Sequence, residues 1–269
     1  MNIAQQIIEA HKLKFGSLPT LQQCSVSGSA LFNADCIDIL PLIHDKSVQL
    51  ILADLPYGNG KTACKWDSVL DLNKLWIEYE RIIADSGAII LTSAQPFTTQ
   101  LIASNYRLFK YELIWDKVNR YTGFAQANIM PLKRHENILV FAKNKTTYNK
   151  QYRKGKPYKA SRTNGYGEQY TNGKNYKRTD TINNGNHNPC SIIEIKSDNK
   201  KEMGLHPTQK PLELMKYLIS TYSNENDLVL DNTMGVGTCP LAAKELNRRF
   251  IGIEKEPKYY EIACQRCGF

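Results

Sequence analysis

The sequence has no run of apolar residues near the ~18 that a membrane-spanning helix needs, which argues against a helical membrane anchor. Residues 1–14 alternate apolar and polar side chains at helical spacing and lack the apolar centre of a secretory signal, so we expect a cytoplasmic protein. The composition of disordered chains is also absent, because 42% of the 269 residues are hydrophobic and 23% are charged. This length suits one α/β domain with an insertion.

Cysteine patterns with a structural meaning are missing as well. The seven cysteines are odd in number and mostly isolated, so we expect no disulfide framework. Cys264 and Cys267 form one C-x-x-C pair, and His187 with Cys190 is the only other close pair that could complete a zinc site. We therefore expect free thiols and no bound metal.

Strand-like and helix-like segments alternate along most of the chain. The runs at 48–53 and 87–92 are almost continuously apolar, which is typical of parallel strands buried on both faces. Further strands are expected at 30–33, 111–115, 137–141, 228–230 and 250–253, and helices at 36–43, 72–83, 211–221, 238–246 and after Pro96 and Pro257. This order predicts an α/β fold with an open, doubly wound, mainly parallel sheet.

A basic, polar segment interrupts the alternation. Between residues 144 and 180, ten lysines and arginines and six tyrosines accompany only two acids, although the whole chain carries a net charge of +9. Cations in such number can neutralise nucleic-acid phosphates, whereas a solvated loop is the alternative. We expect an N-terminal helix and linker at 1–29, two halves of one domain at 30–143 and 205–269, and an insert at 144–204.

A glycine-rich turn follows the expected strand that ends in Asp231. Gly235 and Gly237 let the backbone approach a ligand, and Glu254 at the end of the next strand can accept hydrogen bonds from ribose hydroxyls. Pro240 stands where a dinucleotide fingerprint needs a small residue, and no G-K-[ST] follows as in a P-loop. A nucleoside without a pyrophosphate fits better, and a turn without a ligand is the alternative.

The segment Asp54-Leu55-Pro56-Tyr57 directly follows the buried strand at 48–53. An acid at the carboxyl end of a central strand points into the crevice where open α/β sheets bind ligands. A planar base can stack on the Tyr57 ring while its exocyclic amine donates to the Asp54 carboxylate and the Leu55 carbonyl. A helix-capping aspartate beside a core tyrosine is the alternative.

Together these segments resemble the β class of amino-methylating DNA methyltransferases, which use S-adenosylmethionine. D-L-P-Y resembles the family's D-P-P-Y motif, H-P-T-Q-K-P at 206–211 is similar to its most specific box, and D-N-T-M-G-V-G-T at 231–238 resembles D-P-F-x-G-S-G-T. Leu55, Asn232 and Thr233 depart from these patterns. The resemblance covers most of 31–263 and implies a class I methyltransferase-like, Rossmann-like fold with a target-recognition insert.

The resemblance implies a role for each matching residue. Asp54, Leu55, Pro56 and Tyr57 would hold the target base. The residues implied at the cofactor are Asp35, Asp54, Thr208, Lys210, Asp231, Thr233, Gly235, Gly237, Thr238 and Glu254. The residues expected at DNA are Arg120, Lys133, Arg134, Lys150, Arg153, Lys154, Lys156, Lys159, Arg162, Lys174, Lys177 and Arg178.

Transfer of a methyl group to N6 of a flipped adenine in double-stranded DNA is the favoured reaction, because Asp at position 54 goes more often with adenine in this family and Ser with cytosine. N4-cytosine methylation, methylation of RNA or of a protein amide, and a non-catalytic nucleic-acid-binding protein stay open as alternatives. The resemblance also admits a homodimer and a separate restriction nuclease as partners.

Overall fold

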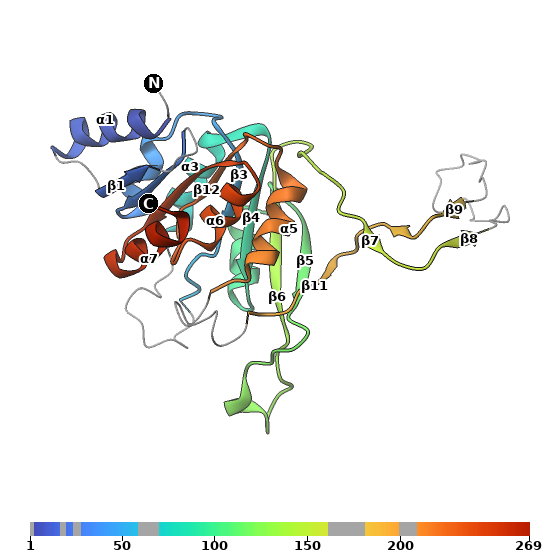
Figure 1. The fold of residues 1–269 in the computed structure, drawn as a ribbon. Coiled ribbons are helices and arrows are strands. Elements are labelled where there is room, and N and C mark those ends of the chain that lie inside the picture. The colour runs from blue at the N-terminus through green and yellow to red at the C-terminus, as the bar shows by residue number, and fades with distance from the viewer. Residues whose placement is uncertain (1–2, 17–19, 24–27, 59–69, 161–180, 199–208) are drawn as a thin grey trace. The chain divides into compact units, whose positions relative to one another are not determined.

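Residues 3–16, 20–23, 28–58, 70–160, 181–198 and 209–269 are described by the structure, which is a computed structural model (Figure 1). The chain divides into two compact units, Met1–Asn149 with Ser191–Phe269, and Lys150–Cys190. Among the described residues, the larger unit contains a sheet of nine strands. No helix in these ranges is both long enough and apolar enough to cross a membrane.

Helices cover both faces of this sheet. The strands are β1 (Thr20–Gln23), β2 (Ala30–Asn33), β3 (Val48–Ala53), β4 (Ile83–Ser93), β5 (Phe109–Asp116), β6 (His135–Phe141), β11 (Ile192–Glu194), β12 (Leu228–Asp231) and β13 (Arg249–Glu254). The helices are α1 (Ile3–Phe15), α2 (Cys36–Ile39), α3 (Leu72–Ile82), α4 (Phe97–Ser104), α5 (Leu212–Tyr222), α6 (Thr238–Glu245) and α7 (Pro257–Cys267), with 3-10 turns at Leu40–Leu42 and Phe124–Gln126.

The strand order is β1-β2-β13-β12-β3-β4-β6-β5-β11. Strands β2, β13, β12, β3 and β4 run parallel, so their carboxyl ends meet at one edge of the sheet. The chain moves outward from β3 to β4 on one side and from β12 to β13 on the other. The order therefore reverses between β12 and β3, which is where doubly wound folds bind ligands. The predicted fold class is confirmed.

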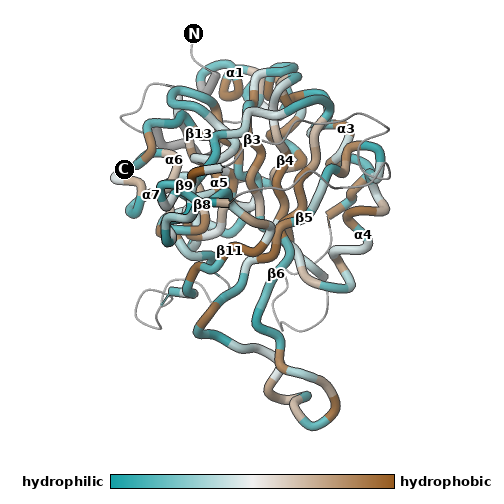
Figure 2. The backbone as a smooth tube through the Cα atoms, turned by 90° about the vertical axis from the view of Figure 1, so that its right-hand side faces the viewer, coloured by the Kyte–Doolittle hydropathy of each residue, from teal (hydrophilic) through white to brown (hydrophobic). Residues whose placement is uncertain are grey.

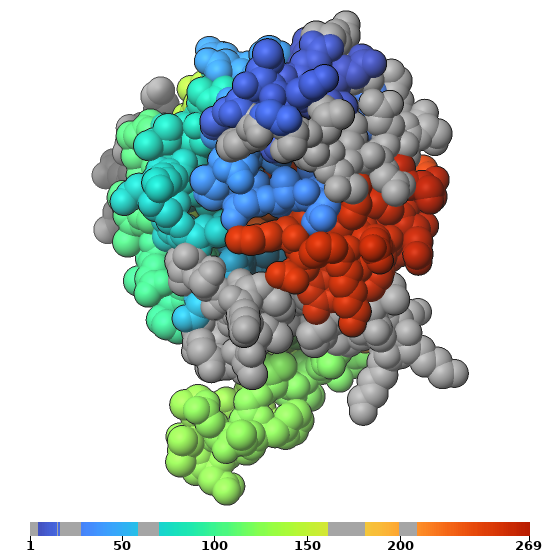
Figure 3. Space-filling model, turned by 90° about the vertical axis from the view of Figure 1, so that its left-hand side faces the viewer, coloured from blue at the N-terminus to red at the C-terminus, as the bar shows by residue number. Residues whose placement is uncertain are grey.

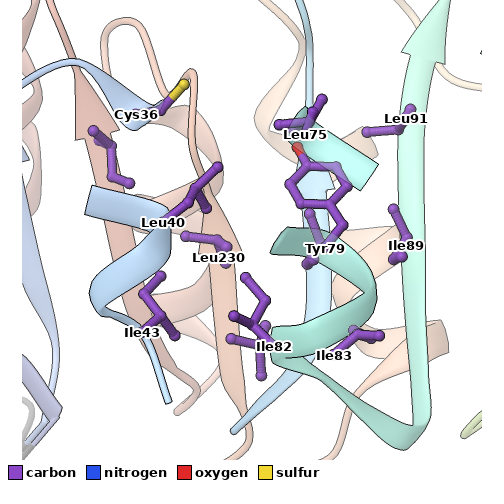
Figure 4. Packing of buried hydrophobic residues seen from close by; sticks show 14 of the residues in the cluster. Cys36, Leu40, Ile43, Leu75, Tyr79, Ile82, Ile83, Ile89, Leu91 and Leu230 are labelled. Atoms are coloured by element: carbon purple, nitrogen blue, oxygen red, sulfur yellow. The ribbon is translucent and has the colours of Figure 1, made fainter. Parts of the chain in front are cut away.

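Alternation along the buried strands divides the core between the two faces. Ile51 of β3 packs in the cluster with α1 to α4, whereas its neighbours Leu50 and Leu52 pack with α5 to α7. Figure 4 shows part of the first cluster, where Tyr79 and Leu75 of α3 lie beside Ile89 and Leu91 of β4. The apolar colouring of β3 and β4 in Figure 2 reflects burial on both faces.

Three local predictions differ from the structure. The linker expected within 1–29 contains β1, which pairs antiparallel with β2; its sequence T-L-Q-Q gave no strand-like alternation. The helix expected at 36–43 ends at Ile39 and continues as a 3-10 turn, because Pro41 cannot donate a backbone hydrogen bond. Strand β4 begins at Ile83, earlier than the expected residue 87.

The second unit, Lys150–Cys190, consists in its described part of two short antiparallel ladders. One pairs β7 (Arg153–Lys154) with β10 (Asn186–His187), and the other pairs β8 (Tyr158–Ala160) with β9 (Thr181–Asn183). The two strands of the first ladder approach closely at Gly155, where a Cβ atom would lie 2.6 Å from the His187 ring. The expected insert, 144–204, is wider than this unit, because β11 pairs with β5 of the main sheet.

The division of α3 into a buried and an exposed face gives a stability test. Leu75 is completely buried against the sheet, whereas Ile77 on the same helix is 67% exposed. Leu75→Ala should lower the free energy of unfolding by about 2–5 kcal/mol through reduced burial and a cavity. Ile77→Ala should change it by no more than about 0.5 kcal/mol. Urea unfolding of both variants measures the difference, and equal losses would contradict the packing.

Candidate active site

The carboxyl edge of the parallel strands brings together acids that lie far apart in the sequence. Asp35 follows β2, Glu254 ends β13, Asp231 ends β12 and Asp54 follows β3. These four strands are consecutive in the sheet, so the acids form a row along its edge. In Figure 3 the red C-terminal surface directly adjoins the blue surface of the early strands, as the β13–β2 pairing requires.

The Asp54 carboxylate is held by three donors, one from its own segment and two from more distant parts of the chain. The Tyr57 hydroxyl donates to Oδ1 at 2.9 Å, and the Thr92 hydroxyl at the end of β4 donates to the same oxygen. The Lys210 ammonium, just before α5, donates to Oδ2. Charge-assisted bonds of this kind fix an acceptor strongly. Asp54 is therefore oriented before any substrate binds.

Lys210 belongs to a row of alternating charges. Its Nζ also lies 3.4 Å from Glu136 Oε2, and Glu136 Oε1 lies 2.6 Å from Lys117 Nζ. The side chains of Lys210 and Glu136 are only 9% and 16% exposed. Burial alone raises the pKa of Glu136, but the two lysines outweigh it and hold this pKa at about 2. Burial likewise lowers the pKa of Lys210, and the Asp54 and Glu136 carboxylates raise it to about 12.

Tyr57 combines a stacked ring with a bonded hydroxyl. Its ring packs on that of Phe97 with centroids 5.4 Å apart and planes inclined by 29°. Burial, followed by the charges of Asp54 and Glu136, raises the pKa of the Tyr57 hydroxyl well above its ordinary value. The hydroxyl therefore stays protonated and donates to Asp54, a contact that sequence reasoning did not predict.

The glycine turn after β12 is hydrogen-bonded to Glu254 and to Asp54. The Gly235 amide donates to Glu254 Oε2 at 2.9 Å, and the Thr233 hydroxyl donates to the backbone carbonyl of Asp54 at 3.2 Å. Gly235 has a φ of +51° and open space where a Cβ would stand, whereas a Cβ on Gly237 would lie 2.8 Å from Ala263. Gly237 thus serves packing against α7, and Gly235 keeps the ligand side of the turn bare.

Asp231 is buried behind this turn, and its pKa is shifted in the opposite direction to that of Glu136. Burial raises its pKa to about 8, with further contributions from the Asp54 and Glu254 charges, although the Thr233 amide donates to it at 3.1 Å. The carboxyl is therefore largely protonated at neutral pH.

A pocket opens at the reversal point between β12 and β3. Asp54, Lys210, Asp231, Gly235 and Thr238 all line it. The lining combines the Lys210 ammonium, two carboxyl groups, a glycine without a side chain and the N-terminus of α6. Such a set of donors and acceptors fits the zwitterionic end of a nucleoside that carries an amino acid. These residues therefore fit S-adenosylmethionine.

The other predicted cofactor residues that the structure describes, Asp35, Thr233, Gly237 and Glu254, are not in the lining of this pocket. Asp35 caps α2 by accepting from the Ile37 amide at 3.1 Å and pairs with Lys255 at 2.9 Å. Its carboxyl pKa is raised by burial but lowered overall by Lys255 and the Ile37 amide. Thr208 lies outside the described residues.

The predicted DNA contacts divide in the same way. Arg120, Lys133 and Arg134 are in the loop between β5 and β6, where Arg134 pairs with Asp116 at 2.5 Å. Lys150, Arg153, Lys154, Lys156 and Lys159 are in the smaller unit. Arg162, Lys174, Lys177 and Arg178 lie outside the described residues.

Comparison with known proteins decides the family. A family model described as DNA methylase, of the N6/N4 type, matches residues 48–265. The chain belongs to the N6/N4 DNA methylase family. Type II methyltransferase M1.MboII of Moraxella bovis is 31% identical to this methylase over 248 residues, 85% of this chain and 92% of that protein. Type II methyltransferase M.HindIII of Haemophilus influenzae is 26% identical over 309 residues, 88% and 94% of the two chains.

Solved structures agree with this assignment. The M1.HpyAVI–SAM complex aligns to the methylase with a TM-score of 0.59 and 25% identity, covering 89% of this chain and 98% of that one. The PvuII cytosine-N4-specific DNA methyltransferase shares the fold, with a TM-score of 0.63 at 14% identity over 92% and 90% of the two chains. The methylase is thus an S-adenosylmethionine-dependent DNA methyltransferase.

The raised pKa of Asp231 predicts how stability depends on pH. Its folded pKa of about 8 exceeds the ordinary value of 3.8, so the folded chain keeps a proton that the unfolded chain releases. Stability should therefore fall as pH rises between these two values, by at most about 1.4 kcal/mol per pH unit from one group. Asp231→Asn should remove this slope. Urea unfolding at several pH values measures the difference between variant and wild type, and a pH-independent difference would refute the assignment.

Proposed function

We propose that this methylase transfers a methyl group to N6 of an adenine flipped out of double-stranded DNA. The observation that carries the proposal is the Asp54 carboxylate at the end of β3, fixed beside the Tyr57 ring and joined to the glycine turn through Thr233. Adenine is preferred over cytosine because position 54 is Asp, which the sequence resemblance associates with adenine. The cytoplasmic location expected from the sequence stays a prediction.

In this proposal the cofactor occupies the pocket between β12 and β3. Bound S-adenosylmethionine supplies a methyl group that is already activated by its sulfonium. Glu254 accepts hydrogen bonds from the ribose hydroxyls, and Gly235 allows the close approach of the amino-acid end. Asp231 and Thr238 line the pocket at that end, and Asp35 is assigned to the adenine amine.

Asp54 and the Leu55 carbonyl act on the target amine. Two acceptors draw the amine hydrogens away from the ring plane, which frees the nitrogen lone pair for the methyl group. The carboxylate also stabilises the positive charge that develops on this nitrogen, and a fixed acceptor costs little reorganisation. Lys210 must leave Asp54 Oδ2 to admit the amine, and its second contact with Glu136 keeps the ammonium paired.

The flipped base stacks on Tyr57 because the target amine cannot be reached inside a duplex. Phe97 supports the ring from its other side, with an interplanar angle of 29°. The cations of the smaller unit bind phosphates and the loop between β5 and β6 adds further contacts. A homodimer and a separate restriction nuclease are included in the proposal as partners.

Product analysis tests the reaction as a whole. The protein is incubated with deuterated-methyl S-adenosylmethionine and genomic DNA, and the digested nucleosides are identified by mass spectrometry. N6-methyldeoxyadenosine carrying the label is expected. Labelled N4-methyldeoxycytidine would overturn the choice of base, and label in RNA or protein alone would overturn the choice of substrate.

Asp54→Ala should reduce methyl transfer to background, because the amine loses its acceptor. Cofactor affinity should change less than about tenfold, a loss of no more than about 1.4 kcal/mol, since Asp231, Gly235 and Thr238 still line the pocket. Tritium transfer and calorimetric titration measure the two quantities. Asp85→Ala is the control, because Asp85 is exposed and pairs with Lys46, which precedes β3 at the end of the strand opposite to Asp54. Turnover near the wild-type rate in Asp54→Ala would refute the mechanism.

Salt dependence tests the smaller unit. Lys154, Lys156 and Lys159 are exposed there, and the slope of log affinity against log salt should become shallower by about 0.9 for each phosphate that is no longer neutralised. The triple alanine variant should bind duplex DNA more weakly and with a smaller slope. Alanine at the exposed Lys12, Lys74 and Lys258 of the main unit is the charge-matched control. Identical slopes in the two triple variants would show that this unit does not bind phosphate.

A further inference from the structure

A loop at residues 117–134 carries large apolar side chains that the protein itself does not cover. Phe124 is 67% exposed, Ile129 77% and Met130 50%. The loop joins β5 to β6 and projects from the sheet in Figures 2 and 3. Clustered exposure of this kind is unfavourable in water and marks a surface that contacts something else.

The loop is built to hold these side chains outward. Its base is closed by the pair Asp116 with His135 and by reciprocal backbone bonds between Thr122 and Lys133 at 2.8 and 2.9 Å. Beyond this bridge the chain forms a 3-10 turn at Phe124–Gln126, and the Ile129 amide donates to the Gln126 carbonyl at 3.0 Å. The apolar tip is thus presented by an ordered backbone, which lowers the entropy cost of binding.

The charge and position of the loop favour DNA as the contact. Residues 117–134 contain four cations and no acid, and three of the cations, Arg120, Lys133 and Arg134, are near the base of the loop. The loop ends where β6 starts, and Asn137 of β6 pairs with Ser93 at the carboxyl end of β4. Since β4 is parallel to β3, the loop leaves the sheet from the same edge as Asp54.

We propose that Phe124, Ile129 and Met130 enter the DNA duplex as an apolar wedge beside the target base, while the cations at the base of the loop contact phosphates. This inference rests on the proposed function and adds a mechanism for base extrusion. Apolar side chains inserted at a base step unstack it, and an unstacked base costs less to flip. A second copy of this chain would not complement the cations at the base of the loop as DNA phosphates do. Self-association through the loop is therefore the alternative outcome of the test.

The experiment compares two duplexes that differ only in how easily the target base leaves the stack. Both carry the target sequence found by modified-base sequencing of DNA from expressing cells, and in one the target base is mismatched. Phe124→Ala/Ile129→Ala should lower kcat/KM at least tenfold on the paired duplex and less than threefold on the mismatched one. Phe124→Leu, which keeps apolar bulk, should retain at least half of the wild-type rate on both.

Ile77→Ala is the matched control, because Ile77 is as exposed as Phe124, 67%, but lies on α3. It should behave as wild type on both duplexes. Equal losses of the double variant on the two duplexes, or no loss, would overturn the wedge. So would a wild-type dimer that becomes a monomer in the double variant by light scattering. Methylation by the wild type is measured in the same assay, so failure of the proposed function itself would be seen separately.

Discussion

The site depends on the hydrogen bond from the Thr233 hydroxyl to the Asp54 carbonyl, 3.2 Å across the boundary between β12 and β3. These two strands are neighbours in the sheet, although about 180 positions separate them in the sequence. Parallel pairing brings both carboxyl ends to one edge, so the glycine turn after β12 adjoins the segment Asp54–Tyr57 after β3. Because the two turns are joined through backbone and side chain, the proposed function has methyl donor and acceptor share one crevice.

The pKa values of the buried acids at this edge are set by neighbouring charges as well as by burial. Asp231 and Glu136 are both buried acids, yet Asp231 has a pKa of about 8 and Glu136 one of about 2. The difference is the presence of Lys117 and Lys210 beside Glu136, whereas Asp231 has carboxylates for neighbours. The row of charges from Lys117 to Asp54 therefore holds the Asp54 carboxylate in a fixed orientation, while Asp231 stays largely protonated at neutral pH. In the proposed function, the zwitterionic end of the cofactor enters a pocket in which one acid, Asp231, can still release its proton.

Much of the fold and part of the site could be predicted from the sequence, because apolar runs, glycines and strand-end acids are local signals. Asp54, Asp231 and Glu254 were found this way, and the structure lines them up along one edge. Glu136 and Thr92 were missed, since their roles come from strand register. Parallel pairing of β4 with β3 brings Thr92 to Asp54, and antiparallel pairing of β6 with β4 brings Glu136 to the same edge. Strand β1 was missed because its four residues have no apolar alternation.

A crystal structure of this methylase with the cofactor analogue sinefungin and a target duplex tests the shared crevice most directly. The account predicts the analogue between β12 and β3, with its ribose hydroxyls on Glu254. Its amine, which replaces the transferred methyl, should lie about 3–3.5 Å from the exocyclic nitrogen of an extruded adenine held by Asp54. An analogue bound elsewhere, or a base that stays stacked while Asp54 faces solvent, would contradict it.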